Sequence, residues 1–360
     1  MIHTDRQLVV EAVEGLGVLQ VHLINAFNLV DREAAFKEVE KYFPDCLQWV
    51  LTCYGVEAEL LLGDFQILSS TGFHQGCTVA GLLFCLVLQP IIERIQLEVP
   101  FLLLNGWYLD DGVNIGKKEE LQKVVDIIME DGPARGLFLS TSASGRLPSL
   151  PKSTVWWTIP SIEEITLGPG IPTSQESGFS LLGTPIGDHQ YVEQAIINSV
   201  RKVQLITAQL PCLEDAHLEF ALLRSCLSLP KMMYTLRTID PTPHQTLWKE
   251  VDIITREALN CILGVPLGST QWEQAQLPVS LGGLGLRSAE EHAPAAFTTS
   301  VLASQDLKER ILNLPEHLCP PVIPASLLAL LSDKQGEEAT VDNFLGVSQK
   351  AASYKIDLHT

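Results

Sequence analysis

The sequence predicts an α+β fold, because strand-like and helix-like patterns interleave over roughly the first half of the chain and the second half is mostly helical. An early apolar run followed by turn residues is typical of a buried strand, and short hairpin patterns alternate with helical ones after it. With 360 residues, 46% of them hydrophobic, the chain can build a sizeable core and two domains.

The elements expected in the first half follow in order. The apolar run 17–24 predicts a buried strand that ends in a turn. An N-capping aspartate predicts a helix over 31–42, and a proline near the first turn predicts another over 44–55. Residues 59–68 predict a hairpin that turns at a Gly-Asp pair, and the apolar run 82–95 predicts a buried helix.

A second hairpin is expected where two apolar runs meet, with two adjacent acids in its turn. The run 101–107 leads into Tyr108-Leu109-Asp110-Asp111, and we expect Gly112 to close the turn. Adjacent carboxylates repel each other unless a cation compensates them. Because Mg²⁺ takes oxygen ligands, Asp110 and Asp111 are candidate magnesium ligands.

The remaining pattern is helical, with two interruptions. Residues 118–129 predict an amphipathic helix, and the breaker-rich stretches 140–151 and 162–178 predict loops. Helices are expected over 192–210 and 218–227, and the tail beyond residue 314 is expected to pack loosely. A later helix carries one apolar stripe, formed by Leu247, Val251, Ile254, Ala258 and Cys261.

Composition restricts partners and compartment. The formal net charge is -19, which counts against a nucleic-acid binder because phosphate contacts need basic residues. Eight scattered cysteines favour reduced thiols over disulfides or structural zinc. The stretch 82–92 is too short to span a bilayer, and no signal peptide is evident. We therefore expect a soluble, intracellular chain with no membrane partner.

Over about residues 17–300 the chain resembles a reverse transcriptase, an RNA-directed DNA polymerase, of the non-LTR retroelement type, in a degenerate and N-terminally truncated form. The resemblance rests on the order of six motifs: His22–Asn28, Gly72–Gly76 running into Leu82–Phe84, Trp107–Gly112, Lys152–Trp156, Leu181–Asp188 and Leu277–Arg287. It implies a right-hand polymerase palm, an antiparallel sheet with packed helices, followed by a helical thumb. The implied divisions are a palm with little or no fingers over 1–158, a connection over 159–190, a thumb over 191–305 and a tail over 306–360.

The resemblance also implies an activity and its partners. Similar enzymes copy an RNA template from a DNA primer and deoxynucleoside triphosphates, using two Mg²⁺ ions, with Mn²⁺ as a possible substitute. Asp110 and Asp111 match the metal ligands of the catalytic hairpin, and Lys152 matches a lysine that serves the pyrophosphate leaving group. A surface lysine in a polar loop is the simpler interpretation of Lys152.

Other positions match contacts to nucleotide, template and primer. Phe27 corresponds to an aromatic gate against the ribose 2′-hydroxyl, although a core aromatic would look the same. Gln75 and Gly76, together with Tyr108, match positions near nucleotide and template. The stretch Leu181-Leu182-Gly183 resembles a primer grip within an apolar hairpin. Exposed thumb cations could meet phosphates or simply face solvent: Arg201, Lys202, Arg224, Lys231 and Arg237.

Three departures predict an impaired or inactive enzyme. His22 occupies the place of the first-strand carboxylate, and imidazole suits zinc or copper better than magnesium. Cys77 and Thr78 replace the acidic residue and proline that normally follow the Gln-Gly pair. Only about sixteen residues precede Gly17, so the basic fingers region is not evident.

Other functions remain open at this point. The chain could be a non-catalytic nucleic-acid-binding protein, or an interaction protein or relic derived from a retroelement. A zinc hydrolase built on His22, His74 and a carboxylate matches no familiar zinc spacing. Cys77 as a nucleophile would need a histidine and acid partner that the sequence does not reveal.

Overall fold

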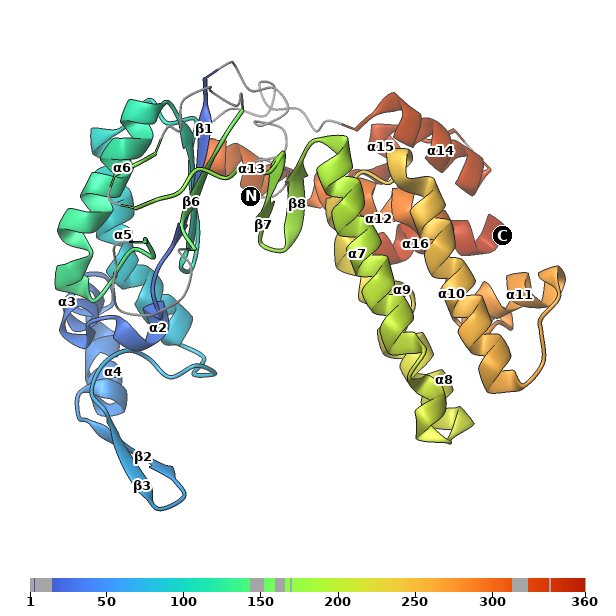
Figure 1. Ribbon diagram of the computed structural model, residues 1–360, viewed down its shortest axis with the longest axis horizontal. Coiled ribbons are helices and arrows are strands. Elements are labelled where there is room, and N and C mark those ends of the chain that lie inside the picture. The colour runs from blue at the N-terminus through green and yellow to red at the C-terminus, as the bar shows by residue number, and fades with distance from the viewer. Residues whose placement is uncertain are drawn as a thin grey trace. The chain divides into compact units, whose positions relative to one another are not determined.

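The computed structural model describes His3 and residues 15–142, 152–158, 166–168, 170–312, 323–336 and 338–359. The chain divides into two compact units (Figure 1). The N-terminal unit contains the described residues from 15 to Glu176, and the C-terminal unit contains those from Ser177 onward together with His3. Most of the predicted loop 140–151 and parts of 162–178 lie outside the described residues, as does the first part of the predicted tail.

The N-terminal unit is built on an antiparallel sheet of four strands in the order β4-β5-β1-β6. The strands are β1 (Gly17–His22), β4 (Leu104–Tyr108), β5 (Asp111–Gly116) and β6 (Thr154–Trp157). β1 pairs with β5 from Gly17 opposite Gly116 to His22 opposite Asp111. The predicted strand and acid-bearing hairpin are therefore confirmed, and the sheet is antiparallel as expected.

The helices of this unit lie at positions close to those predicted. They are α2 (Ala26–Leu29), α3 (Arg32–Tyr42), η1 (Pro44–Cys46), α4 (Leu47–Tyr54), α5 (Ala80–Glu98), α6 (Lys118–Asp131) and η2 (Pro133–Arg135). Asp31 caps α3 as predicted, because its carboxylate accepts a hydrogen bond of 2.7 Å from the amide of Ala34. Two smaller strands, β2 (Ala58–Leu62) and β3 (Phe65–Ser69), form the predicted hairpin.

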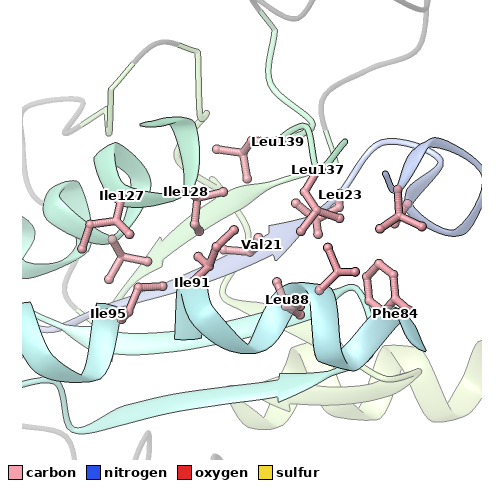
Figure 2. Close-up of a cluster of buried hydrophobic side chains, with 14 of the residues drawn as sticks. Val21, Leu23, Phe84, Leu88, Ile91, Ile95, Ile127, Ile128, Leu137 and Leu139 are labelled. Atoms are coloured by element: carbon pink, nitrogen blue, oxygen red, sulfur yellow. The ribbon is translucent and has the colours of Figure 1, made fainter. Parts of the chain in front are cut away.

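The core of this unit lies between the sheet and the helices α5 and α6. Val21 of β1 and Leu23 just beyond it pack against Leu88 and Ile91 of α5 and Ile128 of α6 (Figure 2). Alternation along β1 then turns His22, between Val21 and Leu23, toward the opposite face of the sheet. The core thereby fixes which face of the sheet carries the hairpin acids.

Helix α5 is longer than the predicted 82–95 and continues through Pro90. By length and composition it is the one helix among the described residues that could cross a membrane. Its buried side chains, including Phe84, Leu88 and Ile95, belong to the core cluster of the N-terminal unit. Helix α5 is therefore packed as a core helix of this unit.

A buried arginine joins α3 to the segment that follows β3. The guanidinium of Arg32 donates to the carbonyls of Gly72 (2.8 Å) and Ser69 (2.9 Å), and to the Ser69 hydroxyl (3.0 Å). Burial lowers the pKa of Arg32 from its ordinary value. The planar fork satisfies several carbonyls at once, which a lysine could not do.

The C-terminal unit begins with a hairpin and continues as helices. β7 (Gly178–Leu181) and β8 (Thr184–Gly187) pair across a turn in which Leu182 and Gly183 have φ values of 48° and 80°. The helical elements are α7 (His189–Thr207), η3 (Leu210–Leu213), α8 (Ala216–Leu222), η4 (Leu223–Leu227), α9 (Leu229–Thr238), η5 (Thr242–His244), α10 (Gln245–Leu263), α11 (Ser269–Gln276), η6 (Val279–Leu281), α12 (Ala289–Ala303), α13 (Gln305–Leu312), α14 (Ala325–Gln335), α15 (Val341–Phe344) and α16 (Gln349–His359).

Two predicted helices begin earlier than expected, because aspartates cap them. Asp188 accepts from the Tyr191 amide, so α7 begins at His189 rather than 192. Asp215 accepts from two amides and starts α8 at Ala216, and a π-helical turn replaces α-helix over Leu223–Leu227. Of the stripe predicted on α10, Leu247, Val251 and Ile254 are buried, Ala258 is half-buried and Cys261 is exposed.

The prediction of a loosely packed tail is wrong for the described residues. Leu331 of α14, Phe344 of α15 and Ile356 of α16 are buried in one cluster with Ala295 of α12. The prolines near residue 320 predict a breaker-rich tail, but the apolar residues beyond them pack against α12. The predicted connection 159–190 is likewise divided, since the boundary between units falls at Glu176.

A buried charge cluster helps to hold the last helix. Asp357 of α16 accepts hydrogen bonds from Arg287 (3.2 Å from Nε) and His292 (3.1 Å from Nε2), and its side chain is 2% exposed. Burial alone would raise the pKa of Asp357, but the hydrogen bonds from His292 and Arg287 outweigh it and hold the pKa below its usual range.

We expect Arg32→Ala to lower the free energy of unfolding of the N-terminal unit by about 3 kcal/mol, because buried carbonyls would lose their donors. Arg32→Lys should recover only part of that loss. Urea unfolding of the full chain, followed by hydrogen exchange of peptides from this unit, measures the change. Lys37→Ala, exposed on the same helix, is the matched control and should change stability by about 0.5 kcal/mol or less. An equal loss in both variants would contradict the proposed role of Arg32.

We expect the Asp357 cluster to stabilise the C-terminal unit above about pH 4 and to lose that effect as the pH falls further. A folded-state pKa below the unfolded one favours the folded state only where the carboxyl is ionised. Asp357→Asn should lower the free energy of unfolding by about 2 kcal/mol or more at neutral pH, because Arg287 and His292 lose their anionic partner. It should also flatten the dependence of stability on acid pH. Thermal unfolding from pH 3 to 7 tests this, with exposed Asp333→Asn as the control. An unchanged acid limb in Asp357→Asn would refute it.

Candidate functional site

The site forms where β1 ends beside the β4–β5 hairpin. His22 and Asp111 lie directly opposite each other on neighbouring antiparallel strands, so their side chains share one face. The Nδ1 atom of His22 lies 3.0 Å from Oδ1 of Asp111, within hydrogen-bond distance. The side chains are 27% and 46% exposed, so a small ligand can reach them.

The backbone of His22 is clamped from the other side of β1. Its amide donates to the Ser153 hydroxyl (3.0 Å), and that hydroxyl donates back to the His22 carbonyl (3.1 Å). The amide of Ser140 also donates to this carbonyl (2.9 Å), and the Ser140 hydroxyl accepts from the Lys152 amide (3.1 Å). The sequence carries little signal for Ser140 and Ser153 as positioning residues, because their contacts with His22 join positions more than a hundred apart in the chain.

The turn between β4 and β5 differs from the one predicted. Tyr108 pairs with Asp111, so the turn consists of Leu109 and Asp110 and Asp111 already belongs to β5. Gly112 does not close the turn. It lies in the strand, and a Cβ there would meet the Trp107 ring at 2.6 Å.

Leu109 adopts an uncommon backbone conformation, with φ of 57°. Its side chain packs against the core cluster of the N-terminal unit, and one methyl lies 3.8 Å from where a Cβ on Gly81 of α5 would be. Apolar packing therefore offsets the backbone strain, which is of order 1 kcal/mol or more. The same packing holds the neighbouring Asp110 at the tip of the hairpin.

The electrostatics of the site show an excess of negative charge. Burial raises the pKa of Asp110 from its ordinary value, and the neighbouring Asp111 raises it further. His22 and Lys152 act in the opposite direction through their charges. The structure therefore brings Lys152 into electrostatic range of Asp110, although its exposed side chain also fits a surface lysine.

His22, Asp110 and Asp111 form the one group of metal-ligating side chains found among the described residues, with a ligand atom from each within 4.8 Å of the others. Two carboxylates and an imidazole fit one divalent cation. They supply less negative charge to a pair of Mg²⁺ ions than three carboxylates would, because the third donor is an imidazole. The residues present therefore fit one cation with some affinity for nitrogen donors.

The structure separates the remaining predicted residues into several environments. The Phe27 ring stacks on Phe84 at 4.8 Å between centroids, as a partly buried core aromatic would. Tyr108 is 59% exposed beside the acids. Gln75 and Gly76 are exposed, and the φ of 91° explains glycine at the second position by its backbone conformation.

The zinc-hydrolase alternative is not supported by the geometry. His74 is not part of the metal-ligating group that the described residues form; its Nε2 lies 3.1 Å from the Ser69 hydroxyl and its ring lies against Tyr54. Among the described residues, the groups that lower the pKa of Cys77 are the Tyr54 hydroxyl and then the backbone amides at the start of α5, not a histidine paired with an acid. Neither residue forms a hydrolytic constellation within the described part of the chain.

The primer-grip-like residues lie in the C-terminal unit. Leu181 ends β7 and is buried, and the carbonyl of Leu182 accepts a hydrogen bond of 2.5 Å from the Tyr234 hydroxyl. Gly183 completes the turn. The predicted thumb cations are all exposed on helical segments of this unit: Arg201, Lys202, Arg224, Lys231 and Arg237.

No protein-family model and no curated protein matches the chain. Among solved structures it is similar to apo telomerase from Candida tropicalis, at 10% identity and a TM-score of 0.39, over 86% of this chain and 55% of that one. It is also similar to telomerase from Candida albicans in complex with a fragment of telomeric RNA, at 9% identity and a TM-score of 0.33, over 87% and 52%. The chain spans about half the length of these solved structures. Likenesses of this strength leave fold and function to be argued from the chain's own residues.

Proposed function

We propose that the chain is a reverse-transcriptase-like protein whose nucleotidyl transfer is lost or strongly impaired. In this proposal the sheet β4-β5-β1-β6 and the helices α5 and α6 form a polymerase palm, and the helices of the C-terminal unit form a thumb. The observation that carries the proposal is the register of β1 and β5, which sets His22 against the twin-acid hairpin. A strand end facing such a hairpin is where similar polymerases keep a third carboxylate.

The substitution of imidazole for carboxylate explains the proposed impairment. An imidazole ring supplies no negative charge to balance divalent cations. Its Nδ1 atom also pairs with Asp111, which uses one carboxylate oxygen that a metal would otherwise take. Loss of outer contacts at metal sites already costs roughly 10–100-fold, so loss of a direct anionic ligand should cost more.

The proposal assigns roles to the residues that are present. Asp110 and Asp111 hold one divalent cation with His22, and that cation would polarise a phosphate oxygen when bound. Lys152 supplies positive charge near Asp110 for an anionic ligand. Tyr108, Gln75 and Gly76 are exposed where a nucleotide could contact them, and Phe27 shapes the turn after β1. RNA template, DNA primer and deoxynucleoside triphosphates are the proposed partners, inside the cell.

Non-catalytic nucleic-acid binding is the second candidate. It is favoured by the five exposed basic side chains on the helices of the C-terminal unit. Such side chains would contact phosphates without reading sequence. The net charge of -19 limits how strongly a polyanion can bind.

We expect the site to bind Mn²⁺ at least tenfold more tightly than Mg²⁺, because an imidazole donor suits the softer ion. Electron paramagnetic resonance of Mn²⁺, with Mg²⁺ as competitor, measures both affinities. His22→Asp should reduce the preference for Mn²⁺ over Mg²⁺, and Asp110→Asn should abolish metal binding at the site. Asp64→Asn, an exposed acid in the turn between β2 and β3, is the matched control. Unchanged Mn²⁺ affinity in Asp110→Asn would show that the ion binds elsewhere.

We expect little or no template-dependent primer extension by the natural chain with either Mg²⁺ or Mn²⁺. His22→Asp should raise extension about tenfold or more, because it restores a third carboxylate. Denaturing gels of a labelled primer on an RNA template measure the product, and His22→Asp with Asp110→Asn should remove any gain.

Robust extension by the natural chain, abolished in Asp110→Asn, would overturn the proposed impairment. Binding of the same primer–template without extension, in both the natural chain and His22→Asp, would favour the non-catalytic candidate. A filter-binding assay at low salt distinguishes these outcomes, because phosphate contacts weaken steeply as salt rises.

A further inference from the structure

The C-terminal unit contains a cavity of about 310 Å³ between α7, η3, α8 and α10. This volume lies at the lower end of the range of small-molecule pockets. Its apolar wall includes Leu210, Ile254 and Ile262. The cavity belongs to one compact unit and shares no residue with the His22–Asp111 site, so its chemistry is independent of the proposed function.

The polar groups that line the cavity are acidic or neutral. Glu219 of α8 and Glu257 of α10 contribute carboxylates, and Gln204 and Thr207 of α7 contribute an amide and a hydroxyl. None of the described lining residues is a lysine, arginine or histidine. The lining therefore favours a positively charged ligand over an anion or a neutral apolar one.

Two of these groups are buried without a visible partner. Glu219 is 7% exposed, and none of the ion pairs formed by the described residues involves it. Thr207 is 5% exposed, and its hydroxyl oxygen makes no hydrogen bond within the described structure. The buried Thr207 hydroxyl without a partner costs free energy that a bound donor would recover, and the Glu219 carboxylate can accept from the same donor.

We propose that this cavity binds a small organic monocation, an ammonium group on an apolar body. The ammonium has three N–H donors and no acceptor, which suits two carboxylates and a hydroxyl oxygen. It would donate to Glu219, Glu257 and Thr207, and its apolar body would cover Leu210, Ile254 and Ile262. Glu219 supplies most of the selectivity, because its side chain is largely buried, whereas Glu257 is exposed.

A cysteine in the lining provides a reporter of occupancy. Cys261 is an exposed free thiol four residues after Glu257 on α10, so both side chains lie on the same face of the helix. A ligand in the cavity should slow the alkylation of Cys261. Cys226, an exposed free thiol of the same unit that does not line the cavity, serves as an internal reference.

The experiment titrates the full chain with n-hexylamine at neutral pH and follows alkylation of each cysteine by peptide mass spectrometry. n-Hexanol and hexanoate are the neutral and anionic counterparts of the same length. We expect saturable protection of Cys261 by the amine, with an apparent affinity at least tenfold above that of the alcohol. Hexanoate should give no protection, and the rate at Cys226 should not change.

Variants assign the effect to the carboxylates. Glu219→Gln should weaken amine binding about tenfold or more, and Glu257→Gln should weaken it less. Glu250→Gln, an exposed glutamate of α10 outside the cavity, is the matched control and should bind like the natural chain. Ala258→Leu should reduce binding of amine and alcohol alike, because it fills the lining from α10.

Three outcomes would overturn the proposal. Equal protection by amine and alcohol would show an apolar pocket without charge selectivity. Absence of Cys261 protection at millimolar amine would show that the cavity takes no such ligand. Amine binding that is unchanged in both Glu219→Gln and Glu257→Gln would show that these carboxylates do not accept from the ammonium group. If Glu219→Gln fails to fold, Glu257→Gln and Ala258→Leu decide the question alone.

Discussion

The pairing of His22 with Asp111 is the constraint on which the rest of the site depends. It follows from the register of β1 and β5, because a slip of one residue would turn His22 into the core between the sheet and α5. Val21 and Leu23 make that slip costly, since their burial would be lost. The hydroxyl of Ser153, directly before β6, bonds both the amide and the carbonyl of His22 and fixes the same register. Core packing and one buried hydroxyl thus place an imidazole against an acid.

The same pairing changes what the acids can do. In a three-carboxylate site, repulsion is relieved only when cations bind, so the site has a strong affinity for them. Here His22 and Lys152 already oppose the repulsion between Asp110 and Asp111. When side chains of the site already neutralise part of its charge, binding a metal ion releases less free energy. The imidazole therefore reduces both the negative charge and the drive to bind two cations.

Much of the fold follows from local sequence patterns, whereas the details of the site depend on contacts between distant residues. Asp31 and Asp188 each cap a helix by a hydrogen bond from the amide three residues later. Such a cap can be predicted from local sequence, and of the two only the cap at Asp31 is predicted above. The local pattern predicts Gly112 as a turn residue. Its actual role, to leave room for the Trp107 ring, depends on a contact between neighbouring strands that the pattern does not show. The packing of the tail does not follow from its local pattern, because its apolar residues are buried against Ala295 of the preceding helix α12.

Both candidate sites are acidic, and this unites two otherwise separate parts of the molecule. The hairpin presents Asp110 and Asp111, and the helical cavity presents Glu219 and Glu257, in a chain of net charge -19. Summed negative potential raises the local concentration of cations at such sites and lowers that of polyanions. A nucleic acid would therefore approach most easily with divalent ions already on its phosphates, or on a restricted surface where the exposed cations of the C-terminal unit outnumber the acids. The proposed polymerase ancestry has to be reconciled with this field, because the chain is strongly acidic as a whole although His22 adds no negative charge beside the hairpin.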